Sequence, residues 1–156
     1  MTEASSSERD TTILRDDVTP KRGCESESPD ETRLIASEFA RNLPAGTVLS
    51  LVGDLGAGKT EFVKGLAIGL GVENEVASPT FTVVHEYRGG RLALFHMDFY
   101  RLNEERELDE VGFDDYLMAG GVCAIEWGDK FPKRLPPDSV TVRFIIHGND
   151  KRTIVW

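Results

Sequence analysis

The stretch GDLGAGKT, residues 53–60, combines three glycines with a lysine and a threonine directly after the apolar run TVLSLV. Gly53, Gly58, Lys59 and Thr60 satisfy the pattern G-x-x-x-x-G-K-[ST], with a strand expected before it and a helix after it. Glycines allow successive backbone N–H groups to approach phosphate oxygens without a Cβ in the way. A chance glycine-rich turn is the alternative, but the strand–loop–helix context favours a phosphate-binding loop (P-loop).

Within such a loop each residue type has a defined task. The start of the helix adds a partial positive charge, Lys59 would reach the β- and γ-phosphates, and the Thr60 hydroxyl would ligate Mg²⁺. The residues of the loop predicted to bind the nucleotide are Leu55, Gly56, Ala57, Gly58, Lys59 and Thr60.

A P-loop NTPase also needs an acidic partner for the metal at the end of a second buried strand. Glu126 follows four apolar residues in VCAIE and is the favoured Mg²⁺ ligand, although an ordinary strand-end carboxylate is the alternative. Asp98 is its rival, since it could hold the metal through water or orient the attacking water. His96 lies two residues before Asp98, on the same face of the expected strand, and we interpret it as structural or as a hydrogen-bonding neighbour.

The identity of the nucleotide and of the reaction is narrowed by what the sequence lacks. The Asn-Lys-x-Asp motif with which GTPases recognise the base is absent, which favours ATP. A small-molecule kinase would need an arginine-rich lid and a second substrate domain, and neither is evident. Arg101, in DFYR, is the only arginine near the expected site, and a surface position is an equally good interpretation of it.

Length, charge and cysteine content bound the class of protein. The chain has 156 residues and a formal net charge of −9, which argues against nucleic-acid binding by this chain alone. Cys24 and Cys123 form no CxxC pair and are expected to be free thiols in a reducing compartment. The N-terminus resembles no signal peptide, and no apolar stretch approaches the ~20 residues that span a bilayer, so a cytoplasmic location is expected.

The rest of the sequence predicts the elements that would position these residues. Residues 1–27 are polar and charged and are expected to be a disordered tail, followed by one domain over 28–156. Ser28, Pro29 and Glu31 have the spacing of an N-cap, a first helical residue and a capping box. The further expected elements are a helix ending near Pro44, a strand at 47–52, a helix at 59–70, a hairpin around RGG, one or two short helices at 107–118, a strand at 121–127 and a C-terminal antiparallel pair. This order predicts an α/β sheet with flanking helices.

Five stretches, in this order, resemble one family: GDLGAGKT, SPTF (78–81), HMDFYRL (96–102), ELDEVGFDDYL (107–117) and AIEW (124–127). The chain is similar over about residues 28–147 to the TsaE (YjeE) family, small bacterial ATPases required for threonylcarbamoyladenosine modification of tRNA beside the anticodon. The resemblance implies a small P-loop NTPase-like mixed sheet with a mostly parallel core. It also implies ATP and Mg²⁺ as cofactors, and action on the TsaB–TsaD complex to allow multiple turnovers.

The resemblance also implies roles for individual residues. Thr80 would be the switch-like threonine facing the γ-phosphate, and Asp98 the acidic residue needed for hydrolysis. Glu126 would be the Mg²⁺ ligand beside Thr60, Trp127 would border the site, and Glu31 would contact the adenosine end of the nucleotide. The catalytic set is therefore Lys59, Thr80 and Asp98. A non-hydrolysing nucleotide sensor and, third, a small-molecule kinase are the alternatives.

Overall fold

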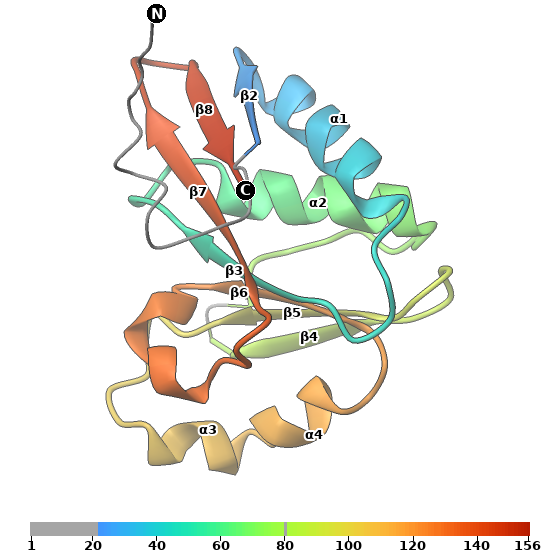
Figure 1. The fold of residues 1–156 in the computed structure, drawn as a ribbon, viewed down its shortest axis with the longest axis vertical. Helices are drawn as coiled ribbons and strands as arrows, with labels where there is room; N and C mark the ends of the chain where they lie inside the picture. The colour runs from blue at the N-terminus through green and yellow to red at the C-terminus, as the bar shows by residue number, and fades with distance from the viewer. Residues whose placement is uncertain (1–21, 80) are drawn as a thin grey trace, which may run out of the picture.

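The computed structural model describes residues 22–79 and 81–156, which form one seven-stranded mixed sheet with helices on both faces (Figure 1). The strand order is β2-β8-β7-β3-β6-β5-β4. The strands are β2 (Gly23–Ser26), β3 (Val48–Val52), β4 (Val84–Tyr87), β5 (Leu94–Asp98), β6 (Val122–Glu126), β7 (Val140–Ile146) and β8 (Arg152–Val155). The helices are α1 (Pro29–Ala40), α2 (Lys59–Leu70), α3 (Arg106–Glu110) and α4 (Phe113–Leu117), with 3₁₀ turns η2 (Gly128–Lys130) and η3 (Pro132–Arg134).

The centre of the sheet is parallel and its margins are antiparallel, as the sequence predicts. Strands β7, β3, β6 and β5 run parallel in that spatial order. Strand β4 forms the expected hairpin with β5, and β8 forms the expected C-terminal pair with β7. Because parallel strands end at the same edge of a sheet, the residues after β3, β5 and β6 are brought together there.

Alternation along the central strands divides the core into two layers. Leu49 and Leu51 pack with α1 and α2 on one face, whereas Val48 packs on the other face. The second face is covered by aromatic side chains, among them Phe99 and Phe113, whose ring centroids lie 5.4 Å apart. In Figure 1 the helices α1 and α2 lie on one side of the sheet and α3 and α4 on the opposite side.

Helices α1 and α2 are packed backbone to backbone through small residues. A Cβ at Gly65 would lie 2.3 Å from the carbonyl oxygen of Arg33 and 2.6 Å from the Cβ of Ala36. A Cβ at Gly69 would lie 2.3 Å from the carbonyl oxygen of Ser37. This close approach fixes the position of α2, whose first two residues are Lys59 and Thr60 of the predicted phosphate site.

The start of α1 confirms the predicted cap with one difference. The Ser28 hydroxyl accepts a hydrogen bond from the Glu31 N–H at 3.1 Å, and Pro29 is the first helical residue. The Glu31 carboxylate accepts from the N–H of Glu27 at 2.7 Å rather than from the cap residue itself. Glu31 therefore closes the turn before the helix, one residue earlier than in the usual capping box.

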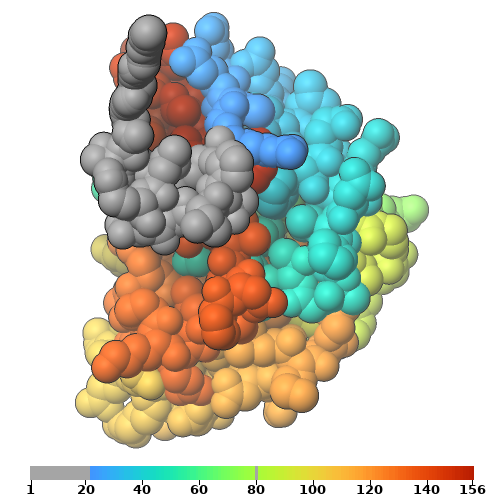
Figure 2. Space-filling model, in the orientation of Figure 1, coloured from blue at the N-terminus to red at the C-terminus, as the bar shows by residue number. Residues whose placement is uncertain are grey.

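The predicted tail boundary at residue 27 is wrong within the described part of the chain. Gly23–Ser26 form β2, which pairs with β8 at the margin of the sheet, and residues 1–21 lie outside the described residues. The prediction relied on apolar content and therefore missed this strand, which is held by backbone pairing with β8 and by a buried polar contact. Ser26 is fully buried and its hydroxyl shares a 2.8 Å hydrogen bond with that of Thr32. Figure 2 shows the resulting face, on which the N-terminal strand and helix adjoin the C-terminal strands.

Both cysteines lie among the described residues. Cys24 and Cys123 are free thiols, and burial raises the pKa of Cys123 to about 12, so this thiol is unreactive near neutral pH. Over residues 22–79 and 81–156, none of the helices has the length and apolar content that crossing a bilayer requires.

Candidate functional site

Residues 53–58 turn sharply between β3 and α2, and three glycines make that turn possible. Gly56 and Gly58 have φ values of 80° and 103°, a left-handed region that costs glycine little. At Gly53 a Cβ would lie 3.0 Å from the Cβ of Phe144 on β7, which is tighter than ordinary packing. The glycines of the motif thus serve backbone conformation at two positions and close approach at the third.

The lysine of the motif is buried, and its side chain folds back onto the first residues of this turn. Lys59 is 5% exposed, and its Nζ donates to the carbonyl oxygens of Gly53 at 2.5 Å and Asp54 at 3.3 Å. The same Nζ lies 4.3 Å from the ring centroid of Trp127. Burial lowers the pKa of Lys59, and the nearby carboxylates, Glu126 foremost, act in the opposite direction.

Two carboxylates face the lysine from the ends of neighbouring strands. Asp98 ends β5 and Glu126 ends β6, and the two residues are paired in the parallel register. They are 6% and 5% exposed, respectively. The Thr60 hydroxyl donates to Glu126 Oε2 at 2.9 Å, which joins the start of α2 to the end of β6. A hydroxyl and a carboxylate oxygen at this spacing are hard donors of the kind that Mg²⁺ prefers.

Glu126 has a second partner behind it in the sheet. His96 is fully buried, and its Nε2 lies 2.6 Å from the same Oε2 of Glu126. A proton on Nε2 makes this contact a hydrogen bond to the carboxylate, and Nδ1 then has no hydrogen-bond partner among the described residues. Of the two interpretations of His96 from sequence, the hydrogen-bonding neighbour is confirmed.

Asp98 is held differently from Glu126. Its Oδ1 accepts a hydrogen bond from the backbone N–H of Tyr100 at 2.9 Å, and its own N–H donates to the carbonyl of Val83 at 3.0 Å. Val83 has a φ of 70°, which is unusual for a β-branched residue and marks a constrained turn before β4. The Tyr100 N–H therefore helps to orient the Asp98 carboxylate, and the Val83 carbonyl holds the backbone of Asp98.

These groups surround one cavity of about 490 Å³. Its lining residues are Leu55, Gly56, Ala57, Gly58, Lys59, Thr60, Glu61, Ser78, Asp98, Tyr100, Glu126 and Trp127. All six predicted residues of the loop, both carboxylates and Trp127 are brought together here. Thr80 lies outside the described residues.

Sequence reasoning missed three lining residues, Glu61, Ser78 and Tyr100. Ser78 and Tyr100 belong to the SPTF and HMDFYRL stretches, so their family motifs were the available signal. The Tyr100 ring lies 5.2 Å from that of Trp127, a residue with a left-handed φ of 61°. A left-handed φ is strained for tryptophan, and here it belongs to the residue whose ring lies over the Lys59 ammonium.

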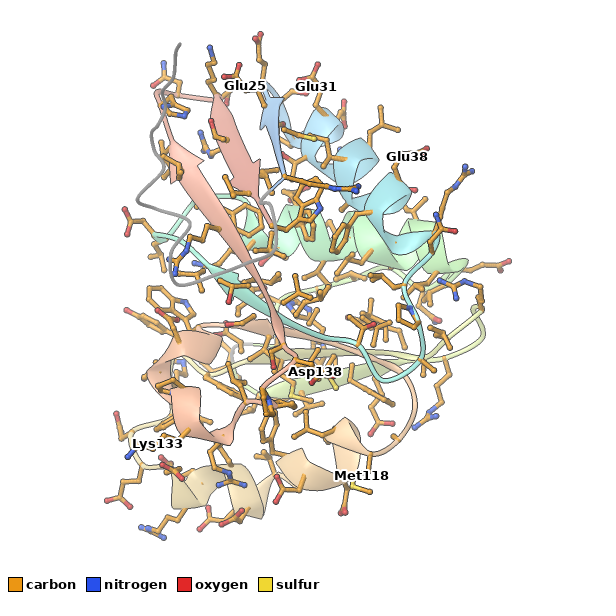
Figure 3. The ribbon with its side chains drawn as sticks, in the orientation of Figure 1. Glu25, Glu31, Glu38, Met118, Lys133 and Asp138 are labelled. Atoms are coloured by element: carbon orange, nitrogen blue, oxygen red, sulfur yellow. The ribbon has the colours of Figure 1, made fainter. Side chains whose placement is uncertain are left out.

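Two other predicted residues lie outside this cavity. Glu31 is exposed at the outer end of α1 (Figure 3) and is engaged with the N–H of Glu27. A smaller hollow of about 100 Å³ separates the start of α1 from the back of the loop, and Ser28 and Gly56 are among its lining residues. The contact of Glu31 with adenosine stays a prediction. The guanidinium of Arg101 lies over the exposed ring of Phe81, 4.5 Å from its centroid.

Comparisons with known proteins agree with these features. Residues 26–154 match the family model described as "Threonylcarbamoyl adenosine biosynthesis protein TsaE". A relative named tRNA threonylcarbamoyladenosine biosynthesis protein TsaE, from Bacillus subtilis (strain 168), is 44% identical over 129 residues, covering 83% of this chain and 80% of its own. A relative of the same name from Treponema pallidum (strain Nichols) is 43% identical over 133 residues, covering 84% of this chain and 98% of its own.

A solved structure is also similar. The crystal structure of YdiB from Bacillus subtilis superposes with a TM-score of 0.75 at 38% sequence identity. The match covers 87% of this chain and 84% of the YdiB chain.

Proposed function

Because the chain belongs to the TsaE family of threonylcarbamoyl adenosine biosynthesis proteins, we propose that it is the ATPase of this tRNA modification pathway. Its ATP hydrolysis would act on the TsaB–TsaD complex, allowing that complex to perform multiple rounds of threonylcarbamoyl transfer to the adenosine beside the anticodon. The observation that carries the proposal is the Thr60–Glu126 contact of 2.9 Å, which joins the phosphate loop to a strand-end carboxylate.

The loop and Lys59 would bind the phosphates of ATP. The loop presents backbone N–H groups at the start of α2, where the helix dipole favours an anion. Lys59 would exchange its contacts with the carbonyls of Gly53 and Asp54 for contacts with phosphate oxygens. ATP is favoured over GTP because the Asn-Lys-x-Asp motif is absent from the sequence.

The donor set at Thr60 and Glu126 fits a magnesium ion. Mg²⁺ usually takes one or two protein ligands and completes its shell with phosphate oxygens and water. Thr60 Oγ1 and Glu126 Oε2 would supply these protein ligands, and the His96 hydrogen bond would keep the Glu126 carboxylate in place. When bound, the ion would neutralise charge on the phosphates.

Asp98 favours hydrolysis over a role as a non-hydrolysing nucleotide sensor. A sensor needs phosphate and metal contacts alone, whereas this cavity holds a second buried carboxylate beside Glu126. Asp98 would accept a hydrogen bond from the attacking water and orient it toward the γ-phosphate. Lone activity is expected to be slow, because the proposed ATPase works together with the partner complex.

The test is phosphate release from ATP with Mg²⁺, measured for this protein alone and with a TsaB–TsaD preparation. We expect slow release alone and faster release with the complex. A parallel assay of tRNA threonylcarbamoylation should show several product molecules per TsaD only when this protein and ATP are both present. ATP binding without any phosphate release in either mixture would instead support the sensor, and phosphate transfer to a small molecule would support a kinase.

A further inference from the structure

Arg152, the first residue of β8, lies outside the nucleotide cavity and contacts the phosphate loop from behind. Its Nη2 donates to the carbonyl oxygen of Gly56 at 3.0 Å, and its Nε donates to that of Ala57 at 3.2 Å. Arg152 lines the small hollow behind the loop and is absent from the lining of the nucleotide cavity. We propose that Arg152 is a positioning residue that holds the phosphate loop in its anion-binding conformation from behind.

The planarity of the peptide bond connects these contacts to the opposite face of the loop. In a trans peptide the C=O and the following N–H point in opposite directions. Drawing the carbonyl of Ala57 toward β8 therefore turns the N–H of Gly58 away from β8, whereas the N–H of Ala57 donates within the loop to the carbonyl oxygen of Asp54 at 3.0 Å and closes its turn. Gly56 and Gly58, with φ values of 80° and 103°, could otherwise rotate these peptide planes at little cost.

The remaining contacts of Arg152 hold its guanidinium against the turn between β7 and β8. Its Nη1 donates to the carbonyl oxygens of Gly148, Asn149 and Lys151 in the turn between β7 and β8, at 3.3, 3.2 and 3.1 Å. Among the described residues, no ion pair joins Arg152 to a carboxylate. The guanidinium charge is thus set among carbonyl oxygens, beside the loop that would receive an anion, and it adds to the positive potential there.

A lysine cannot reproduce this arrangement. The planar guanidinium contacts two carbonyls of the loop and three of the turn at once, whereas an ammonium offers one point of attachment. Lys151, the neighbouring residue, instead pairs with Glu25 of β2 at 3.5 Å. Holding the loop from behind therefore requires arginine at position 152, and another cationic side chain would not replace it.

The experiment compares Arg152→Ala and Arg152→Lys with Arg143→Ala, in which an exposed arginine of the adjacent strand β7 is removed. Dissociation constants for Mg·ADP are measured by isothermal titration, alongside the melting temperature of each variant. Arg152→Ala should weaken ADP binding about tenfold or more, since it removes charge-assisted hydrogen bonds, and Arg152→Lys should recover only part of this loss. Arg143→Ala should bind within about twofold of the parent.

A second measurement separates positioning from stability. Guanidinium ion at low millimolar concentration should restore part of the ADP affinity of Arg152→Ala and leave Arg143→Ala unchanged. ADP binding by Arg152→Ala within twofold of the parent, or an equal loss in Arg143→Ala, would overturn the inference. Because the inference rests on the proposed nucleotide site, absence of ADP binding by the parent protein would overturn both together, whereas the first two outcomes leave the proposed function standing.

Discussion

The two walls of the cavity are built by different means. One wall is backbone: a glycine-rich loop held by turns, with Lys59 as its one buried cation. The other wall is side chains: Asp98 and Glu126, placed next to each other by the parallel register of β5 and β6. The first wall suits binding of an anion, and the second suits a metal ion and a water molecule.

Substitutions in the two walls should therefore affect nucleotide binding and turnover differently. In the proposed function the backbone wall would contact ground-state phosphates, so the loss of these contacts should appear in nucleotide affinity. The carboxylate wall would contact the metal ion and the attacking water, so the loss of these contacts should appear in metal dependence or in turnover. Thr60 links the walls, since it belongs to α2 and donates to Glu126.

The strongest way to break the backbone wall is Lys59→Ala. This substitution removes the cation expected to touch the β- and γ-phosphates, and turnover should fall by about 10²–10³-fold together with nucleotide affinity. The measurements are phosphate release in the presence of the partner complex and ADP titration. Lys64→Ala is the matched control, because Lys64 lies further along α2, pairs with Glu61 at 3.2 Å and does not line the cavity. Parent-like turnover by Lys59→Ala would refute the phosphate-loop assignment.

The separate roles of the two carboxylates can be tested by comparing Asp98→Asn with Glu126→Gln. Both substitutions are nearly isosteric. Glu126→Gln, like Thr60→Ala, should reduce the effect of Mg²⁺ on nucleotide affinity, because it weakens a metal ligand. Asp98→Asn should leave binding nearly intact and remove turnover, because an orienting group acts mainly in the transition state.

Titrations of ATP with and without Mg²⁺, paired with single-turnover hydrolysis, distinguish the two variants. The expected difference is about tenfold or more in the Mg²⁺ effect for Glu126→Gln and less than about twofold for Asp98→Asn. Binding lost in Asp98→Asn but unchanged in Glu126→Gln would exchange their roles.

The same contrast decides what the sequence could predict. The backbone wall is contiguous, residues 53–60, so its motif and its flanking strand and helix were evident from residue types alone. The carboxylate wall joins residues 28 positions apart through strand register, so each carboxylate could be proposed but their relative roles could not. The hydrogen bonds of Glu31 and Arg152 could not be predicted from the sequence, because they depend on where β2 and β8 lie. These strands pair at the margin of the sheet, and a polar edge strand has little hydrophobic pattern by which its pairing could be predicted.

A smaller effect, on stability, should follow from moving α2, which carries Lys59 and Thr60, away from α1. Gly65→Ala places a methyl group 2.3 Å from the Arg33 carbonyl oxygen, so α2 must move away from α1. We expect a loss of about 1–3 kcal/mol in the free energy of unfolding, larger than the gain in helix propensity of up to about 1 kcal/mol. Thermal and urea unfolding measure this loss. Gly23→Ala is the control, because its Cβ would meet only ordinary contacts of 3.6 Å or more. An unchanged or raised stability for Gly65→Ala would show that the helices separate freely.

The smallest effect is expected in a titration with tRNA, because the positive charge of the backbone wall should not give this protein affinity for tRNA. Non-specific nucleic-acid affinity comes mainly from clustered lysine and arginine side chains. The chain has 18 of these against 27 acidic residues. Its most basic stretch, DKFPKR (129–134), is largely engaged within the fold. Lys130 donates to the carbonyls of Tyr100 and Leu102 at 2.8 and 2.5 Å, and Arg134 pairs with Asp109 and Asp114.

The outer surface adds repulsion rather than attraction, since Glu25, Glu31 and Glu38 lie along the edge formed by β2 and α1 (Figure 3). We therefore expect no measurable tRNA binding by this protein alone at an ionic strength of about 0.15 M, and tRNA held instead by the partner complex. Polarisation titrations of labelled tRNA against the lone protein, the TsaB–TsaD complex and their mixture provide the test. An acidic surface of this kind could occupy a basic tRNA site on the complex, in which case tRNA and this protein exclude each other in the mixture. Tight, salt-sensitive binding by the lone protein would instead mean that basic side chains engaged in these internal contacts are released to an RNA, and the carboxylate-rich exterior would then need another explanation.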